Sequence, residues 1–339
     1  MILTGDVNLR NVTDPSKPFE LVADILRQED VVFGNLEGCL SDVVDDYLYS
    51  SKHLWRHAGT AGAPALKLGG FDAVGCANNV TYGAEAILSS LAVLDEMGLP
   101  HTGAGIDMKS ARIPVVLDRN GTSYGFLQYT SVFWPIGHEA NETSPGVATV
   151  KTHTAYLPTT SGGNTPPATA ITLTWPDSEY LKRFEEDILA LRDRVDVLVV
   201  SCHWGVSGSD EIPQYQVDLG HAAIDAGADL VFGHGAHVIQ AIEVYNDAPI
   251  FYSLGNFSFG WEPMGPDWVG LMVQAEIQNK KITRVSCSPV KEDNHTDRRT
   301  VIRSLSEERE AMKVLARQSD MFNTDLDFNG DRVLVLERS

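Results

Sequence analysis

The sequence predicts an α/β fold, and two observations carry that prediction. Short apolar runs alternate with amphipathic stretches of helical spacing along most of the 339 residues, and several of the apolar runs end in Asp, Asn, Glu or His. A strand, a polar tip and a helix, repeated in this order, are typical of a sheet with helices packed on it. The 43% content of apolar residues is sufficient for a large core.

The N-terminal half contains three strand and helix units followed by a hairpin. Apolar runs predict strands at residues 1–8, 30–38 and 71–79, and helical spacing predicts helices at residues 18–29, 63–70 and 84–98. Residues 112–130 are expected to form two strands joined at Asn120-Gly121, a dipeptide typical of tight hairpins.

Residues 135–176 interrupt this pattern. The stretch is rich in Pro, Gly, Ser and Thr and is too long for an ordinary connection, so we expect an insertion, a lid or a mobile binding loop. The pattern then resumes with helices at 178–195 and 215–227, strands at 196–205, 228–238 and 248–257, and a hairpin at 269–290. We divide the chain into a main domain at 1–302 and a C-terminal helix and strand at 303–339 that pack on the same domain.

Composition argues against several classes of function. A formal net charge of −20 is unfavourable for nucleic-acid or anionic-membrane binding, which needs clustered Lys and Arg. The four cysteines lack the spacing of a zinc ribbon or a disulfide framework, so we expect buried reduced thiols. With no leader-like N-terminus and no apolar run of about 18 residues, we expect a cytoplasmic protein without a membrane span.

Polar side chains follow the predicted strands at their carboxyl ends. In an open α/β sheet ligands bind at this edge, so side chains from separate strands are expected to meet in one pocket. A metal site or an acid/base centre requires carboxylates, carboxamides and imidazoles of this kind. The candidates are Asp6 with Asn8, Asn35 with Glu37, Asn78 with Asn79, His203, His234 with His237, and Asn256.

Six motifs, in this order, resemble one known family. They are GDVNL, FGNLEG, CANNV, SCHWG, GADLVFGHGAHVIQ and FYSLGNF, and they extend over about residues 1 to 260. The chain resembles the CapA-like proteins, associated with poly-γ-glutamate synthesis, within the calcineurin-like metallophosphatase superfamily. The resemblance implies a four-layer α/β/β/α sandwich with all of these strand ends around one pocket.

The resemblance also implies a candidate metal centre. In that superfamily the corresponding side chains bind two metal ions, and manganese, iron or zinc would suit imidazole and carboxylate ligands. Two departures count against this interpretation. Val80 stands where the family usually has a histidine that acts beside the metals, and Asn8 stands where the superfamily has a histidine ligand. The ligands that the motifs carry over are Asp6, Glu37, Asn79, His203, His234 and His237.

A small branch of the CapA-like group, the lasso-peptide epimerases, is also similar to this chain. That resemblance implies an isomerase that inverts a Cα from L to D in a ribosomally made lasso precursor peptide, by a two-base 1,1-proton transfer without metal or cofactor. The residue inverted would be the C-terminal one, with tryptophan as the suggested kind, and a small leader-peptide-binding protein would assist. Buried carboxylates and imidazoles support such a transfer when their pKa values are brought close.

The candidate residues divide into catalytic and orienting groups. Asp6 is the first candidate for one base because it ends the first central strand, and His295 is the candidate for the opposite face because its loop could fold over the pocket. His203, His234 and His237 are alternatives for the second base or bind the substrate. The orienting residues also include Asn8, Glu37, Asn78 and Asn79.

Two further features would suit a peptide substrate. The insertion could close over an extended chain, and Trp134, Trp261 and Trp268 could line an aromatic pocket, although each is also consistent with an ordinary surface or core position. Three functions therefore stay open. They are a metal-independent peptide epimerase, a metal-dependent phosphoesterase or other hydrolase in poly-γ-glutamate or envelope metabolism, and a binding protein that keeps the fold.

Overall fold

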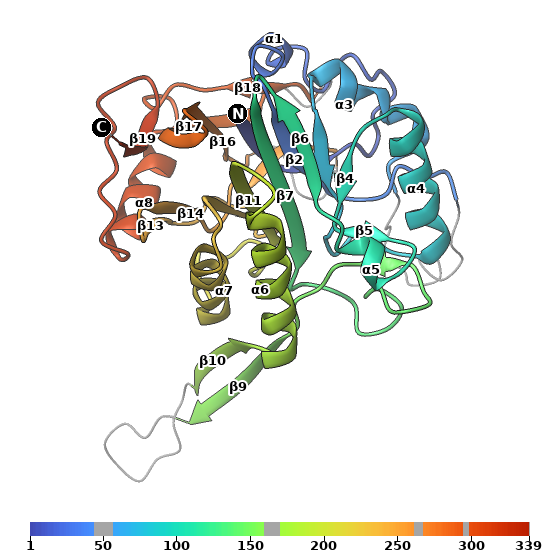
Figure 1. Cartoon of the computed structure of the whole chain (residues 1–339). Coiled ribbons are helices and arrows are strands. Elements are labelled where there is room, and N and C mark those ends of the chain that lie inside the picture. Colours follow the sequence, from blue (N-terminus) through green and yellow to red (C-terminus); the bar gives the residue numbers. More distant parts are fainter. Residues whose placement is uncertain (44–56, 159–169, 261–266, 294–297, 339) are drawn as a thin grey trace.

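Two main sheets lie face to face at the centre of the molecule, and helices cover their outer faces (Figure 1). The structure, a computed structural model, describes residues 1–43, 57–158, 170–260, 267–293 and 298–338. The order of layers is helices, sheet, sheet and helices. This confirms the predicted α/β fold and the four-layer sandwich that the resemblance implies.

The first sheet is built around β1 (Ile2–Asn8), which is buried along its whole length. β1 pairs in parallel with β2 (Val32–Leu36) on one side, and on the other with antiparallel β16 (Gly270–Gln278) and parallel β15 (Asn256–Phe259). Successive side chains of a strand face opposite layers, so Leu3 enters the core between the sheets and Ile2 the core under the helices. The remaining strands are β3 (Ala73–Gly75), β4 (His101–Thr102), β17 (Lys281–Glu292), β18 (Thr300–Ile302) and β19 (Val333–Glu337).

The second sheet contains four parallel strands with an antiparallel strand at each edge. The predicted hairpin is confirmed, since Asn120 and Gly121 have φ values of 51° and 81° at the turn between its two strands, as a tight hairpin turn requires. The order across the sheet is β13 (Ile242–Tyr245), β14 (Ala248–Phe251), β12 (Leu230–His234), β11 (Val197–His203), β7 (Thr122–Thr130) and β6 (Val115–Arg119).

Helices cover both sheets and one end of the space between them. The first sheet carries α1 (Ala23–Leu26), α3 (Pro64–Gly69) and α4 (Ala84–Glu96), and the second carries α6 (Ser178–Arg192) and α7 (Gln214–Asp225). Met312 and Leu315 of α8 (Arg309–Asp320) enter the core between the sheets. The helix predicted at 18–29 is shorter than expected. Between Lys17 and Val22 the backbone forms tight turns instead, in which an N–H donates to the carbonyl oxygen three residues earlier.

The segment 135–176 departs from the α/β pattern, as the sequence predicts. Its described part is nevertheless more ordered than a loop. β8 (Gly146–Val147) pairs with β5 (Ala104–Gly105) beside α5 (Met108–Ala111), and β9 (Thr152–Pro158) pairs with β10 (Ala170–Pro176). β9 and β10 form a two-stranded arm that projects from the body below α6 and α7 (Figure 1).

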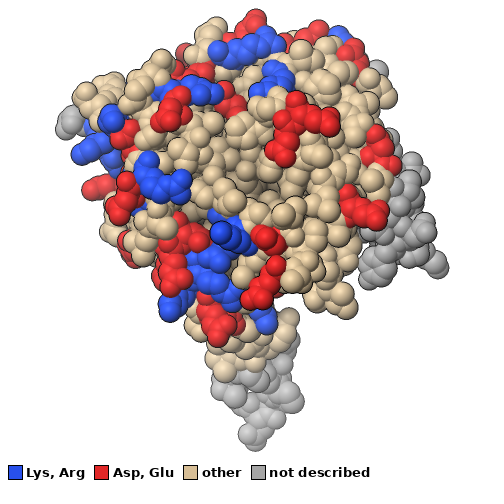
Figure 2. All heavy atoms as spheres, turned by 45° about the vertical axis from the view of Figure 1, so that its right-hand side comes forward, with Lys and Arg blue, Asp and Glu red and all other residues tan. Residues whose placement is uncertain are grey.

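The surface and the thiols agree with the composition. On the face drawn in Figure 2, basic side chains gather in small groups that lie next to acidic ones. All four cysteines are free and buried, as predicted, and burial raises the pKa of the Cys39, Cys76, Cys202 and Cys287 thiols. Among the described residues, no helix combines the length and apolar character needed to cross a membrane.

Candidate functional site

The strand ends of both sheets meet at one buried cluster, as the sequence predicts. Register alone brings several members together, because Asp6 is paired with Asn35 of β2 and with Asn256 of β15. In the second sheet, His203 at the end of β11 is paired with His234 at the end of β12. The carboxyl ends of neighbouring parallel strands therefore supply the cluster.

Asp6 lies at the centre of this cluster and has no exposed surface. Its Oδ1 accepts a hydrogen bond of 2.7 Å from Asn35 Nδ2, and its Oδ2 accepts one of 3.0 Å from the backbone N–H of Gly235. The Asp6 carboxylate also faces three imidazoles, at 3.4 Å from His234 Nδ1, 3.3 Å from His237 Nδ1 and 4.0 Å from His203 Nδ1.

A chain of carboxamides fixes the proton position on His234. The backbone N–H of Ala77 can only donate, so it orients Gln128 Oε1 at 2.6 Å, and the Asp6 carboxylate can only accept, so it orients Asn35. Gln128 Nε2 then donates both to Asn35 Oδ1 at 2.8 Å and to His234 Nε2 at 3.1 Å. His234 Nε2 must therefore present its lone pair, and a neutral His234 carries its proton on Nδ1.

The same chain continues through His203 to the outer part of the site. The His234 Nδ1–H donates to His203 Nδ1 at 2.9 Å, which leaves the His203 proton on Nε2, where it donates to Asn79 Oδ1 at 3.1 Å. Ser201 Oγ also lies 2.8 Å from His234 Nε2. Burial lowers the pKa of His234 to about 4 and that of His203 well below its usual range, so both rings are neutral at pH 7.

Glu37 and His237 form a second group on the other side of Asp6, and this group is charged. His237 Nε2 lies 3.6 Å from Glu37 Oε1, and His237 Nδ1 donates to Asn256 Oδ1 at 2.9 Å. Burial lowers the pKa of His237, but the carboxylates of Glu37 and Asp6 outweigh burial and raise it to about 9. Burial and the charge of Asp6 raise the pKa of Glu37 well above its usual range.

Asp6 is the fixed anion between the two groups. Burial alone would raise its pKa, but the hydrogen bond from His237 and the nearby imidazoles hold the pKa of Asp6 well below its usual range. The turn from His234 to His237 is tight, since Gly235 has a φ of 97° and a Cβ there would lie 2.8 Å from the His203 ring. His237 itself has a φ of 58°, a conformation that non-glycine residues adopt mainly where surrounding contacts hold it.

A cavity of about 270 Å³ opens above this cluster. Glu37, His203 and His237 reach its wall, whereas Asp6 and His234 lie beneath it and have no exposed surface. The lining residues are Asn8, Arg10, Glu37, Asn79, Val80, Val132, His203, Gly205, Ser207, Gly235, His237 and Phe259.

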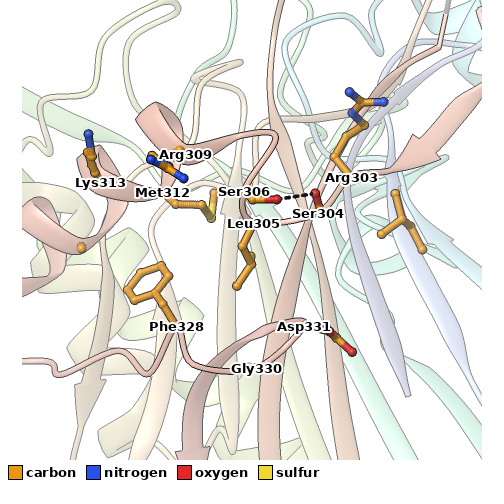
Figure 3. Close-up of a pocket in the computed structure, with 12 residues that line it drawn as sticks. Arg303, Ser304, Leu305, Ser306, Arg309, Met312, Lys313, Phe328, Gly330 and Asp331 are labelled. Carbon is orange, nitrogen blue, oxygen red and sulfur yellow. Dashed lines mark hydrogen bonds between the residues drawn. The ribbon is translucent and has the colours of Figure 1, made fainter.

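A larger cavity of about 710 Å³ lies elsewhere, between α8 and the loops beside β18 and β19 (Figure 3). Figure 3 shows Leu305, Met312 and Phe328 in its central part, with Arg303 and Lys313 further out. Its only described carboxylate is Asp331, and no imidazole lines it. The smaller cavity, which combines a carboxyl group with imidazoles, is therefore the candidate functional site.

Metal binding fits one side of Asp6 better than the other. Two sets of possible ligand atoms lie within 4.8 Å of one another, Asp6 with His203 and His234, and Asp6 with Glu37 and His237. In the first set the His234 Nδ1 that faces the others carries a proton in the neutral ring, so it offers no lone pair. In the second, Glu37 Oε2 is buried without a hydrogen-bond partner in the described part of the chain, and His237 Nε2 faces Glu37. A single cation therefore fits Asp6, Glu37 and His237 when the His237 ring gives up a proton and so presents a lone pair.

The predicted orienting residues occupy two positions. Asn8 and Asn79 line the cavity, and Asn8 Nδ2 donates to the Glu37 backbone oxygen at 2.9 Å. Asn78 is buried away from the wall, where its Nδ2 donates to the Leu36 backbone oxygen at 2.8 Å and so holds the loop after β3. Val80, which replaces the family histidine, lies on the cavity wall.

The remaining predictions for this region have mixed outcomes. His295 and Trp261 lie outside the described residues. Trp134 and Trp268 are not among the residues that line the cavity; Trp134 Nε1 donates to the Asn79 backbone oxygen, and Trp268 is buried. The aromatic side chain on the wall is instead Phe259, which packs edge-on against the His237 ring.

Sequence reasoning missed three residues that shape the site. Gln128 lies two residues before the end of the second predicted strand of the hairpin, and its place near other strand ends was the available signal. Arg10 follows the GDVN motif by two residues and brings a cation to the cavity wall. His138, in the insertion, is fully buried, contacts the backbone oxygens of Asn78 and Thr81 at 3.1 Å and 3.0 Å, and has a pKa lowered to about 4 by burial.

The fold and the site together define a protein of the metallophosphatase-like α/β/β/α class, with a carboxylate, carboxamide and imidazole cluster at the strand ends. Within that class the chain belongs to the family described as bacterial capsule synthesis protein PGA_cap, whose model matches residues 2–260. The match ends before the hairpin of β16 and β17 and before α8.

Curated relatives come from several bacteria. The chain is 30% identical over 248 residues to the capsule biosynthesis protein CapA of Bacillus anthracis, covering 72% of this chain, and it spans about half (54%) of that relative's length. It is 28% identical over 305 residues to the PGA biosynthesis protein CapA of Bacillus subtilis, covering 86% of this chain and 71% of the relative. A solved hypothetical protein from Thermus thermophilus is 14% identical with a TM-score of 0.49, covering 86% of this chain and 98% of that one.

Proposed function

We propose that this protein is a peptide epimerase that inverts the Cα of the C-terminal residue of a ribosomally made lasso precursor peptide, from L to D, without a metal or another cofactor. The observation that carries the proposal is the composition of the cavity wall. His237 is biased toward its protonated form by the Glu37 and Asp6 carboxylates, whereas His203 is biased toward its neutral form. Proton transfer at carbon requires an acid and a base, and His237 can supply the acid; the base is assigned to the opposite face of the Cα, because the Nδ1 lone pair of His203 already accepts from His234.

Each described group has a defined part in this reaction. His237 lines the cavity and holds a proton on Nε2, 3.6 Å from Glu37 Oε1, and Asp6 beneath it balances the charge, so Asp6 positions and charges His237 rather than contacting the substrate. The Nε2–H of His203 and the side-chain amide of Asn79 are donors at the wall, where an enolate oxygen would need them. His295 stays the candidate for the opposite face of the Cα.

The size and charge of the cavity suit the end of a peptide. A volume of about 270 Å³ accommodates one residue rather than a long segment. Arg10 on the wall offers a guanidinium, the group best shaped to bind a terminal carboxylate through two parallel hydrogen bonds. A free C-terminal residue is therefore the substrate position that the wall fits best, and a small leader-peptide-binding partner would supply the rest of the recognition.

The test is solvent exchange at carbon. The candidate precursor peptide is incubated with the protein in deuterium oxide, with and without EDTA, and deuterium at each Cα is located by mass spectrometry. We expect incorporation at one Cα that survives chelation and falls at least about a hundredfold in His203→Asn, because loss of one positioned donor to a developing oxyanion costs about that much. His101→Asn, outside the cluster, is the matched control. Absence of exchange, or exchange abolished by EDTA, would contradict the proposal.

One observation favours a second candidate, a metal-dependent hydrolase acting in poly-γ-glutamate or envelope metabolism. Glu37 Oε2 is a buried acceptor without a hydrogen-bond partner among the described residues, beside Asp6 and His237. A divalent cation such as manganese, iron or zinc held there would polarise a carbonyl or phosphoryl oxygen. The names of the CapA relatives are consistent with this role.

The two candidates differ in metal affinity and in the bond that changes. Calorimetric titration of the protein with Mn²⁺ or Zn²⁺, compared with Glu37→Gln, measures whether the Asp6, Glu37 and His237 group binds a cation. Hydrolysis of p-nitrophenyl phosphate or of a γ-glutamyl peptide, lost on chelation and restored by the metal, would establish the hydrolase. Cα exchange in the presence of EDTA, with no hydrolysis, would eliminate it.

A further inference from the structure

The arm of β9 and β10 carries an exposed apolar face. Residues directly opposite each other in an antiparallel pair share a face, and successive residues of each strand alternate between faces. The four large apolar side chains of this face are each between 44% and 51% exposed, far more than core residues of their kind. The apolar face, as fixed by the pairing register, consists of Leu157 with Ile171, Ala155 with Leu173, and His153 with Trp175.

The opposite face of the arm is polar and anchors the arm to the body. It consists of Thr154, Tyr156, Thr172 and Thr174. Thr174 Oγ1 accepts a hydrogen bond of 3.2 Å from the backbone N–H of Tyr215, in the first turn of α7. The body holds this face only at Thr174, and Tyr156 further out is 73% exposed. The apolar face is likewise open to solvent, and exposed apolar patches of this kind mark binding surfaces.

Tyr215 also connects the arm to the cavity. Its hydroxyl oxygen accepts a hydrogen bond of 2.7 Å from the backbone N–H of Gly205, and Gly205 lines the cavity of the candidate site. A single residue therefore lies between the root of the arm at Thr174 and the cavity wall.

The chemistry of the arm selects an extended, uncharged occupant. In a chain of net charge −20, neither residues 152–157 nor residues 171–176 include Lys, Arg, Asp or Glu, and the carboxylate beside this face is Asp177, which His153 contacts at 2.9 Å at the root of the arm. β9 and β10 form a sheet of two strands, so within the described part of the chain their outer edges have no strand partner. An extended peptide can add to such an edge through main-chain hydrogen bonds, with alternate side chains on the apolar face.

We propose that the arm binds, in an extended conformation, an apolar segment of the substrate peptide that precedes the residue held in the cavity. This inference rests on the proposed function, because it assigns the arm to the same substrate. In this proposal the substrate contacts the protein at two places. Its terminal residue lies in the cavity, and its apolar segment lies on Leu157, Ile171 and Leu173.

The test measures binding separately from turnover, with the full chain. The probe is a fluorescein-labelled synthetic peptide of alternating valine and threonine that ends in a free tryptophan, and the matched probe has aspartate at each valine. We expect the first probe to bind the protein, and Leu173→Asp to weaken that binding by about tenfold or more, as loss of one buried leucine predicts. Thr172→Asp adds the same charge one residue away on the opposite face, and we expect it to change the affinity by less than about twofold.

Several outcomes would overturn the inference. They are no binding of the valine peptide, equal binding of both probes, or equal loss in the two variants. A dimer, seen by sedimentation, that Leu173→Asp dissociates would assign the face to a second copy of this chain instead. Circular dichroism melting checks folding, and Leu173→Ser, with the same expected direction, replaces the aspartate variant if it is unfolded. Selective binding without Cα exchange would contradict the epimerase alone, and Cα exchange unaffected by Leu173→Asp would contradict the arm alone.

Discussion

Imidazoles lie on both sides of Asp6, but they are neutral on one side and charged on the other. On one side, His203 and His234 are neutral, with pKa values lowered by burial. On the other, His237 is charged, with a pKa raised to about 9 by Glu37 and Asp6 against the effect of burial. All three rings are buried and lie within 4.0 Å of Asp6, so neither burial nor distance from the carboxylate explains the difference.

The neighbours of each ring explain the difference. Gln128 donates a hydrogen bond to His234, and such a donor is compatible only with a ring that keeps a lone pair. His237 instead faces acceptors only, the oxygens of Asp6, Glu37 and Asn256. The orientation of amides beyond the imidazoles thus separates a neutral pair from a cation inside one cluster, so that His237 can act as an acid while His203 offers a neutral N–H donor.

The largest expected effect comes from removing the shared anion. Asp6→Asn leaves the His237 cation without its main partner in a buried site, so we expect the free energy of unfolding to fall by about 3 kcal/mol or more. We also expect Cα exchange to fall by at least about a hundredfold. Urea unfolding and the deuterium assay measure the two effects. Asp193→Asn, at an exposed helix end, is the control, and an Asp6→Asn loss no larger than its loss would refute the central role of Asp6.

The next largest effect is a dependence of the free energy of unfolding on pH, and it comes from His237, the charged imidazole beside Asp6. The folded pKa of His237, about 9, lies above its ordinary value of 6.5, so its ion pair stabilises the protein fully below about pH 6.5, and that contribution is lost as pH rises through 9. We expect His237→Gln to lower the free energy of unfolding by on the order of 2 kcal/mol at pH 6 and by much less at pH 10. Melting curves of both proteins at the two values measure this. A difference that does not change with pH would show that His237 is neutral in the fold.

A smaller effect is expected from removing the hydrogen bond that fixes the proton position on His234. Gln128→Leu removes the donor that fixes His234 and leaves the Ala77 N–H unpaired, so we expect the free energy of unfolding to fall by about 1–2 kcal/mol. Because His234 can then present either nitrogen, we also expect Zn²⁺ to bind about tenfold more tightly, measured by competition with a chelating dye. Gln216→Leu removes another buried glutamine, from α7, and should lower stability without a gain in zinc affinity. Unchanged zinc affinity in Gln128→Leu would refute the proton assignment.

Much of the fold could be predicted because its signals are local. Alternating apolar runs gave the order of most strands and helices, and Asn120-Gly121 gave a hairpin turn. The helix at 18–29 was too long in the prediction because helical spacing alone does not show where tight turns replace helical hydrogen bonds. The arm was expected as a loop, since its Thr-rich strands lie between Pro and Gly residues and pair only with each other.

The members of the site could be predicted, but not their states. Strand ends gave Asp6, Glu37, His203, His234 and His237 as one cluster, because parallel strands end at the same edge. Which side chain reaches the cavity wall depends on the exact backbone direction at each strand end, and the sequence pattern does not give that direction. Asp6 was expected to contact the substrate, and it lies beneath the cavity wall. The proton on His234 depends on the orientation of Gln128, which a motif does not encode.

The smallest expected effect tests whether position 80 alone decides the chemistry. Val80 lies partly exposed on the cavity wall, so Val80→His should change the free energy of unfolding by less than about 0.5 kcal/mol. This variant has the histidine that the resemblance leads one to expect at position 80. The His234 nitrogen that faces the other candidate ligands still carries a proton and cannot bind a metal. We therefore expect no gain in Mn²⁺-dependent hydrolysis of p-nitrophenyl phosphate. Val80→His combined with Gln128→Leu removes both obstacles and should gain measurable hydrolysis. If Val80→His alone gains it, the amide chain does not separate the two sides, and the missing histidine alone distinguishes this site from a phosphatase.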